Sequence, residues 1–134
     1  MKKNLILTIA MFSLLACSSD DENNLDPIVG TWYFFSDSGV EVDECNKRST
    51  ILFNDNGTFS STNYGNQDDP NNCVIENKDS GTWINNSNNK YQITDIKTNT
   101  KQIYTITFSD NGNSFMSETN GFGDTINIQV FKRK

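Results

Sequence analysis

The 134-residue chain contains no histidine, and this absence excludes several kinds of chemistry. Histidine is the usual general base near neutral pH and the commonest metal ligand in proteins. Carboxylates alone can hydrolyse glycosides, but they must face each other across a cleft. The acidic residues here fall mostly in turns and in an N-terminal polar stretch, which is typical of a solvated surface. We therefore expect no enzyme activity, no catalytic residue, no cofactor and no metal site.

Positive charge is also scarce. The chain has 11 lysine and arginine residues against 17 aspartate and glutamate residues, and the basic residues form no stripe. A surface of this kind repels phosphate backbones and anionic lipid headgroups. The composition thus excludes nucleic acid as an expected partner.

The one long apolar run lies at the N-terminus. Lys2 and Lys3 precede an apolar stretch from Leu5 to Leu15, which is too short for a stable transmembrane helix and is typical of a secretory signal. The sequence Leu-Leu-Ala-Cys at 14–17 resembles the bacterial lipoprotein signal. This resemblance implies cleavage before Cys17 and attachment of acyl chains such as palmitate to that residue, which would anchor the protein to a membrane. An ordinary secreted protein with an incidental cysteine is the alternative.

The chain thus divides into a signal peptide (1–16), an acidic flexible tether (17–26) and a folded domain (27–134). The tether is polar, acidic and free of aromatic residues. Its segment 18–22, Ser-Ser-Asp-Asp-Glu, resembles the acidic stretch that exports some lipoproteins to the outer face of the outer membrane. We expect a lipid-anchored protein of the outer membrane that is exposed on the cell surface. The alternative is that the acidic segment is an ordinary soluble tether without an export role.

Only three cysteines are present, and one of them belongs to the lipoprotein signal. Cys45 and Cys73 remain as an even pair in an oxidising compartment. We expect them to form a disulfide, which would stabilise the fold by about 3.5 kcal/mol through the unfolded state. A free, reactive thiol is the alternative.

After the signal, no long segment shows the helical periodicity of apolar residues. Apolar and polar residues alternate with a period of two instead. Gln102–Ser109 points Tyr104, Ile106 and Phe108 to one face, and Thr125–Lys132 does the same with Ile126, Ile128 and Val130. Asp-Asn-Gly at 55–57 and 110–112 supplies the positive-φ residues of tight hairpins. Both turns resemble a calcium loop faintly, but neither has the closing bidentate glutamate.

One triplet, Gly-Thr-Trp, occurs at 30–32 and again at 81–83, and a related hairpin follows each copy. Such a repeat indicates two similar units that bury their apolar faces against each other. Most connections in the second half are short, which makes successive strands antiparallel neighbours. The sequence therefore predicts an all-β, antiparallel up-and-down barrel of about 8–10 short strands. A Greek-key sandwich would need a long crossover, for which only 36–48 and 63–72 are long enough.

The order of these motifs resembles the lipocalin-like domain of small bacterial lipoproteins. The pattern runs from Gly-x-Trp at 30–32 through a Cys before Thr-Ile-Leu-Phe, Asp-x-Gly-Thr-Phe, a second Cys and Ser-Gly-Thr-Trp to a final aliphatic strand. The resemblance covers about residues 25–134. It implies a barrel with one open mouth and a small apolar ligand. The chain lacks the C-terminal helix of larger lipocalins, and its small size raises the question of whether the interior is hollow.

The resemblance and the strand alternation together give a set of candidate barrel-lining residues. By the resemblance, Trp32 would close the floor of the barrel, and Trp83 would be its counterpart in the second half. Most of the set is expected to fill the core, with a few members near the mouth meeting a ligand. The candidates are Trp32, Phe34, Phe53, Phe59, Trp83, Tyr91, Tyr104, Phe108 and Phe115.

Two functional hypotheses follow. The first is a lipid-anchored, lipocalin-like protein that binds or carries a small hydrophobic molecule at the cell envelope. The second is a structural or interaction lipoprotein with a filled barrel, whose acidic loops at 37–48 and 63–72 contact a protein partner. An interior void of a few hundred Å³ that opens at one end would favour the first.

Overall fold

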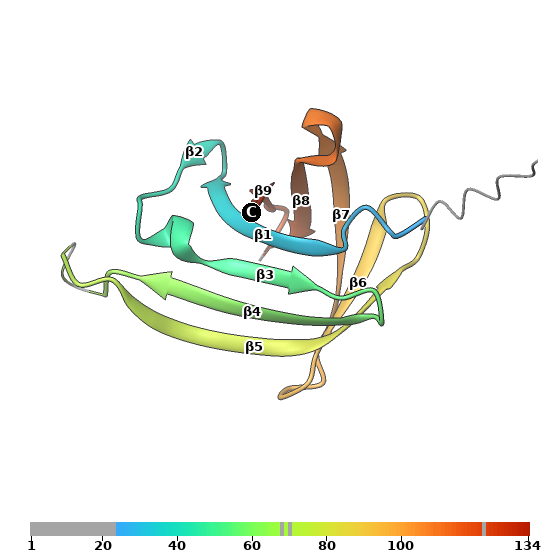
Figure 1. Cartoon of the computed structure of the whole chain (residues 1–134), viewed down its shortest axis with the longest axis horizontal. Helices are drawn as coiled ribbons and strands as arrows, with labels where there is room; N and C mark the ends of the chain where they lie inside the picture. The colour runs from blue at the N-terminus through green and yellow to red at the C-terminus, as the bar shows by residue number, and fades with distance from the viewer. Residues whose placement is uncertain (1–23, 68, 70, 122) are drawn as a thin grey trace, which may run out of the picture.

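The computed structural model describes residues 24–67, 69, 71–121 and 123–134 (Figure 1). The predicted signal peptide, Cys17 and most of the predicted tether lie outside the described residues. No helix of the described part of the chain is long and apolar enough to span a membrane.

Antiparallel strands make up nearly all of the regular structure. Two short 3-10 helices accompany them: η1 (Asn46–Arg48) and η2 (Asp110–Gly112). The strands are β1 (Gly30–Asp37), β2 (Val40–Glu41), β3 (Thr50–Phe53), β4 (Thr58–Gly65), β5 (Val74–Asn85), β6 (Lys90–Asp95), β7 (Lys101–Ser109), β8 (Ser114–Asn120) and β9 (Ile126–Arg133).

The sheet closes on itself. From β3 to β9 each strand pairs with the next in sequence, β3 also pairs with β1, and β9 returns to pair with β1. The two-residue β2 pairs with the end of β1, so eight strands form the barrel. The predicted all-β up-and-down barrel is therefore confirmed. All of these pairings lie between Gly30 and Arg133.

The two halves of the repeat hold each other through their tryptophans. The Trp83 indole N–H donates to the carbonyl oxygen of Asn54 in the first hairpin, over 3.0 Å. On the other side, Arg133 lies over the Trp32 ring, with its guanidinium carbon 4.1 Å from the ring centre, and donates to the carbonyl oxygen of Gly112 in the second hairpin. Trp83 is thus bonded directly to the hairpin of the other half, and Trp32 is linked to the second hairpin through Arg133.

The glycine of each triplet makes room for a neighbouring side chain. A Cβ at Gly30 would stand 2.6 Å from a guanidinium nitrogen of Arg133, and the φ of this glycine is +132°. A Cβ at Gly81 would meet the backbone oxygen of Thr94 and come within 2.9 Å of the Phe59 ring. Both positions need glycine because backbone and side chain approach each other closely there.

Two details of the predicted strands were wrong. The sequence predicts two separate strands at 73–76 and 80–84, whereas β5 runs through the polar residues between them as one continuous strand of 12 residues. In β9, Phe131 is buried in the core and Gln129 lines the interior, whereas Ile126 is 60% exposed. Because successive residues face opposite sides, the predicted Ile126, Ile128 and Val130 face is the outer one.

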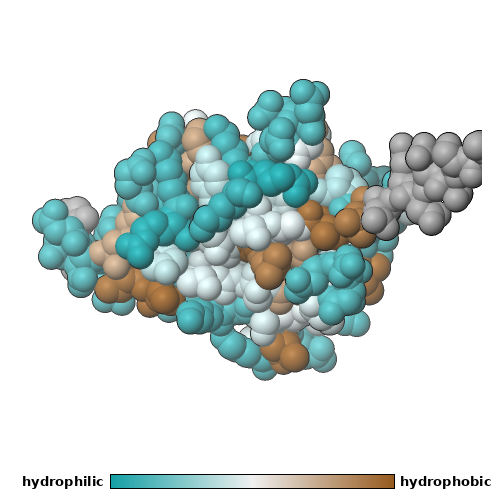
Figure 2. Space-filling model, viewed as in Figure 1, coloured by the Kyte–Doolittle hydropathy of each residue, from teal (hydrophilic) through white to brown (hydrophobic). Residues whose placement is uncertain are grey.

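Several other aliphatic side chains also lie on the outer surface. Ile84, Ile96 and Ile103 are each more than half exposed. Figure 2 shows the hydrophobic patches of one face separated by polar side chains. Singly exposed aliphatic residues of this kind are normal on protein surfaces.

Candidate ligand cavity

The interior of the barrel holds a cavity of about 490 Å³. Residues from all eight barrel strands, and Ser49 just before β3, line it. An eight-stranded barrel is wide enough to hold one small ligand when its own side chains do not fill it. The lining residues are Phe34, Ser49, Thr50, Ile51, Phe53, Phe59, Ser61, Asn63, Asp79, Ile93, Asp95, Tyr104, Ile106, Phe115, Ser117, Gln129 and Phe131.

The lining changes from apolar to polar along the barrel. On β4 the buried Phe59 is followed by Ser61 and Asn63 on the same face. On β8 and β9, Phe115 pairs with Phe131, and the next inward pair is Ser117 with Gln129. Since residues two apart share a face, each of these three strands carries an aromatic ring at one end of the cavity and polar groups at the other.

Aromatic side chains fill the apolar end, which we call the floor. The Trp32 ring meets Phe115 edge-on, with ring centres 4.7 Å apart, and Phe115 stacks on Phe131 at 5.0 Å. Trp32 is fully buried, and its indole N–H donates to the carbonyl oxygen of Ile28 over 2.7 Å. The floor is therefore a closed, packed layer whose polar atoms have partners.

Asp26 fixes the beginning of the domain to the floor. Its two carboxylate oxygens accept hydrogen bonds from the Tyr91 hydroxyl at 2.9 Å and the Asn85 amide at 2.7 Å. In Figure 1 the first described residues accordingly lie beside the β5–β6 turn. Burial and the Asp26 carboxylate both raise the pKa of Tyr91 above its usual value. The chain thus enters the domain at the closed end.

The nine predicted lining residues separate into two groups. Five of them line the cavity: Phe34, Phe53, Phe59, Tyr104 and Phe115. The other four belong to the floor and its packing instead: Trp32, Trp83, Tyr91 and Phe108. Among the five, Tyr104 offers a hydroxyl, which donates to Gln102 over 3.1 Å, and burial raises its pKa.

Two carboxylates of the cavity wall were missed by the sequence analysis, which placed the acidic residues on the solvated surface. Asp79 of β5 and Asp95 of β6 both line the cavity. Each stands four residues from an inward aromatic residue, Trp83 and Tyr91 respectively, so strand parity alone places both on the inner face. This parity was the signal available in the sequence.

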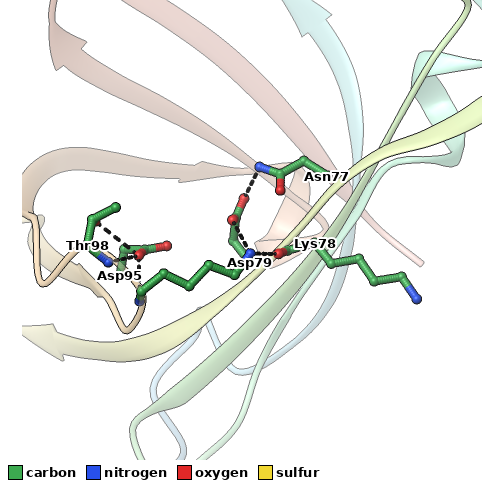
Figure 3. Close-up of polar contacts among 6 residues, drawn as sticks. Asn77, Lys78, Asp79, Asp95 and Thr98 are labelled. Atoms are coloured by element: carbon green, nitrogen blue, oxygen red, sulfur yellow. Dashed lines mark hydrogen bonds and ion pairs between the residues drawn. The ribbon is translucent and has the colours of Figure 1, made fainter.

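Figure 3 shows how neighbouring groups hold the two carboxylates. Asp95 accepts hydrogen bonds on Oδ1 from the backbone N–H groups of Lys97 and Thr98, both over 2.8 Å, and from the Thr98 hydroxyl. The Thr98 N–H contributes most to lowering the pKa of Asp95. Asp79 accepts from the Asn77 amide over 2.7 Å and from the Lys97 ammonium over 3.3 Å. Asp95 is therefore ionised at neutral pH.

The polar end of the cavity, which we call the mouth, has a cross-linked rim. The predicted disulfide between Cys45 and Cys73 is present, with Cα atoms 5.5 Å apart. It joins the β2–β3 and β4–β5 connections, and a hydrogen bond from the Asn66 amide to Asp43 joins them again. The two long loops that the sequence singled out are therefore held together at the mouth.

Comparison with known proteins agrees with this architecture. The model of the lipocalin-like domain family matches residues 28–128, which is most of the chain and nearly all of the barrel. The chain belongs to the lipocalin-like domain family. No curated protein matches the sequence. Within the described residues, this lipocalin-like domain has no cluster of three or more acidic or cysteine side chains that could hold a metal ion.

Proposed function

We propose that this protein is a lipid-anchored lipoprotein of the cell envelope whose barrel binds a small hydrophobic ligand. The observation that carries the proposal is the cavity of about 490 Å³ inside a lipocalin-like barrel. Small-molecule sites are typically concave and mostly apolar, with a few polar groups that fix orientation. The aromatic floor and polar mouth have this composition. The proposal assigns no catalysis to the barrel.

The alternative of a structural lipoprotein with a filled barrel has less support. It requires an interior packed by the protein's own side chains, as interiors without a ligand site usually are. The floor meets this requirement. The mouth does not, because small polar residues such as Ser61 and Ser117 take the place of aromatic rings there. The disulfide-linked loops could still contact a protein partner, but ligand binding in the cavity does not depend on such a contact.

The position of the first described residues fits an anchored protein. Asp26 is bound at the closed end by Tyr91 and Asn85. A tether that precedes it would therefore leave the barrel on the side away from the mouth, so the anchor would not block the cavity. Lipidation is tested by mass spectrometry of the mature protein from its native envelope. An acylated N-terminal Cys17 is expected, and a Cys17→Ser variant should lose the acyl mass and the membrane fraction.

Ligand binding is tested with the chain from residue 18 onwards, which contains every strand of the barrel. We expect the neutral probe 1-anilinonaphthalene to gain fluorescence when it enters the cavity. Native mass spectrometry should detect retained small molecules. Ser61→Phe places a ring in the cavity and should abolish probe binding. Ser60→Phe is the matched control, because Ser60 is the exposed neighbour on the opposite face of β4. Equal binding by both variants would contradict the proposal.

A further inference from the structure

The two carboxylates of the cavity belong to one wall. Gly81 pairs with Asp95, and Asp79 lies two residues before Gly81 on the same strand. The two aspartates are therefore diagonal neighbours on adjacent strands, with Cα atoms about 7–8 Å apart. Among the described residues that line the cavity they are the only charged ones, and no lysine or arginine is part of this lining.

This wall already holds an ammonium group of the protein itself. The Lys97 Nζ lies 3.3 Å from Asp79 Oδ1 and also donates to the backbone oxygen of Lys78 (Figure 3). The Lys97 side chain is 58% exposed, whereas that of Asp79 is 26% exposed. The carboxylate is thus the sheltered partner and the lysine the accessible one. Pairs this open to solvent are weak and exchange readily.

The hydrogen bonds to Asp95 fix its carboxylate without neutralising its charge. All three fall on Oδ1, and their donors are two backbone N–H groups and a hydroxyl. Asp95 therefore keeps a full negative charge at the cavity wall. Neutral polar groups, such as Ser117 and Gln129, line the same cavity and can form hydrogen bonds with a headgroup of any charge.

We propose that the cavity selects amphiphiles with a cationic headgroup, an ammonium in the simplest case. The apolar chain lies on the aromatic floor, and the headgroup lies at the wall formed by Asp79 and Asp95. This inference rests on the proposed function and specifies its ligand class. An anionic headgroup would be held near two carboxylates inside a partly enclosed cavity, where charges interact more strongly than in water. A neutral headgroup would gain hydrogen bonds but no Coulomb attraction.

The test compares three probes with one alkyl chain and different headgroups: dodecylammonium, dodecanoate and dodecanol. Each is titrated below its micelle concentration into the chain from residue 18 onwards, with displacement of the anilinonaphthalene probe as the readout. We expect dodecylammonium to bind at least about tenfold more tightly than dodecanoate, with dodecanol between them.

Variants then assign the preference to the wall. Asp79→Asn with Asp95→Asn should reduce the ammonium-over-carboxylate ratio to near one, because asparagine keeps the acceptor oxygen and removes the charge. Asp55→Asn is the control, since it removes one charge from an exposed turn at the closed end. It should leave the ratio within about twofold, because exposed charges at that distance are screened by salt. Near-ultraviolet circular dichroism checks that each variant is folded.

The possible results separate the two proposals. Binding of all three probes with equal affinity, or tighter binding of dodecanoate, would overturn the headgroup inference and leave the proposed cavity function standing. Failure of every probe to bind would overturn both. An ammonium preference that persists in the double variant would also contradict the inference, because the net negative charge of the whole surface would then be its source.

Discussion

The floor and the mouth of this barrel are built from the same strands but serve different purposes. At the floor, strands contribute rings and two indoles whose N–H groups donate to backbone carbonyls. At the mouth the same strands contribute serine, asparagine, glutamine and aspartate. Under the proposed function, the groups that stabilise the fold and the groups that recognise a ligand are thus separated along the strands, and not between the two faces of the sheet alone.

The comparison predicts that the floor carries most of the stability. Trp32→Ala removes a fully buried ring that contacts Phe115 and lies under Arg133. We expect a loss of about 3–5 kcal/mol in the free energy of unfolding, measured by urea denaturation. Ile103→Ala is the control, because Ile103 is 54% exposed and its truncation should change stability by less than about 0.5 kcal/mol. Similar losses for both would contradict the importance of the floor.

The disulfide is the one large stabilising element expected at the mouth. It closes a loop across a sequence separation of 28 residues. Replacing both cysteines, Cys45→Ser with Cys73→Ser, should lower the free energy of unfolding by about 3.5 kcal/mol through the entropy of the unfolded chain. Binding of a probe that consists of an alkyl chain without a charged headgroup should change little, because the substitutions do not alter the aromatic floor. A loss of probe binding in a variant that is still folded would mean that the cross-linked rim shapes the cavity itself.

Tyr91 offers a smaller test of the floor, with a pH signature. Its pKa is raised, so the folded state favours the protonated phenol. The stability from this group is therefore full below pH 10, the ordinary tyrosine value, and falls as the pH rises further. Tyr91→Phe should cost about 1.5 kcal/mol near neutral pH by removing the hydrogen bond to Asp26.

The same variant should flatten the alkaline decline only in part, because the pKa of Tyr104 is also raised. Tyr33→Phe on the outer face serves as the control. An unchanged alkaline profile in Tyr91→Phe would show that the phenol is not coupled to folding.

Sequence reasoning found the barrel because its signals are local. The two Asp-Asn-Gly turns fix hairpins, and the repeated Gly-Thr-Trp triplet marks two strands that must pack together. The disulfide followed from an even pair of cysteines and the expectation of an oxidising compartment. Each of these motifs is recognised from only one to three residues, so they can be found without knowledge of the whole structure.

The mouth was harder to predict because a barrel with a polar interior breaks the usual rule of apolar inside and polar outside. In β9 that rule predicted that Ile126 and the residues on its face point into the barrel, whereas in the structure Gln129 points inward. Register by itself cannot decide between the faces when both carry apolar residues. Phe131, two residues from Gln129, held the decisive information, since a buried ring fixes the parity of the strand.

Substitution of Gln129 should have the smallest effect on stability, and it tests the division between floor and mouth most directly. The Gln129 side chain lines the mouth next to Ser117, its cross-strand partner, and it is only partly buried. Gln129→Ala should therefore change the free energy of unfolding by less than about 0.5 kcal/mol. Its effect should instead appear in the affinity for ligands with a polar headgroup, measured beside an alkane of equal length. A large loss of stability would mean that the polar residues of the mouth hold the fold together, and the division between floor and mouth would no longer stand.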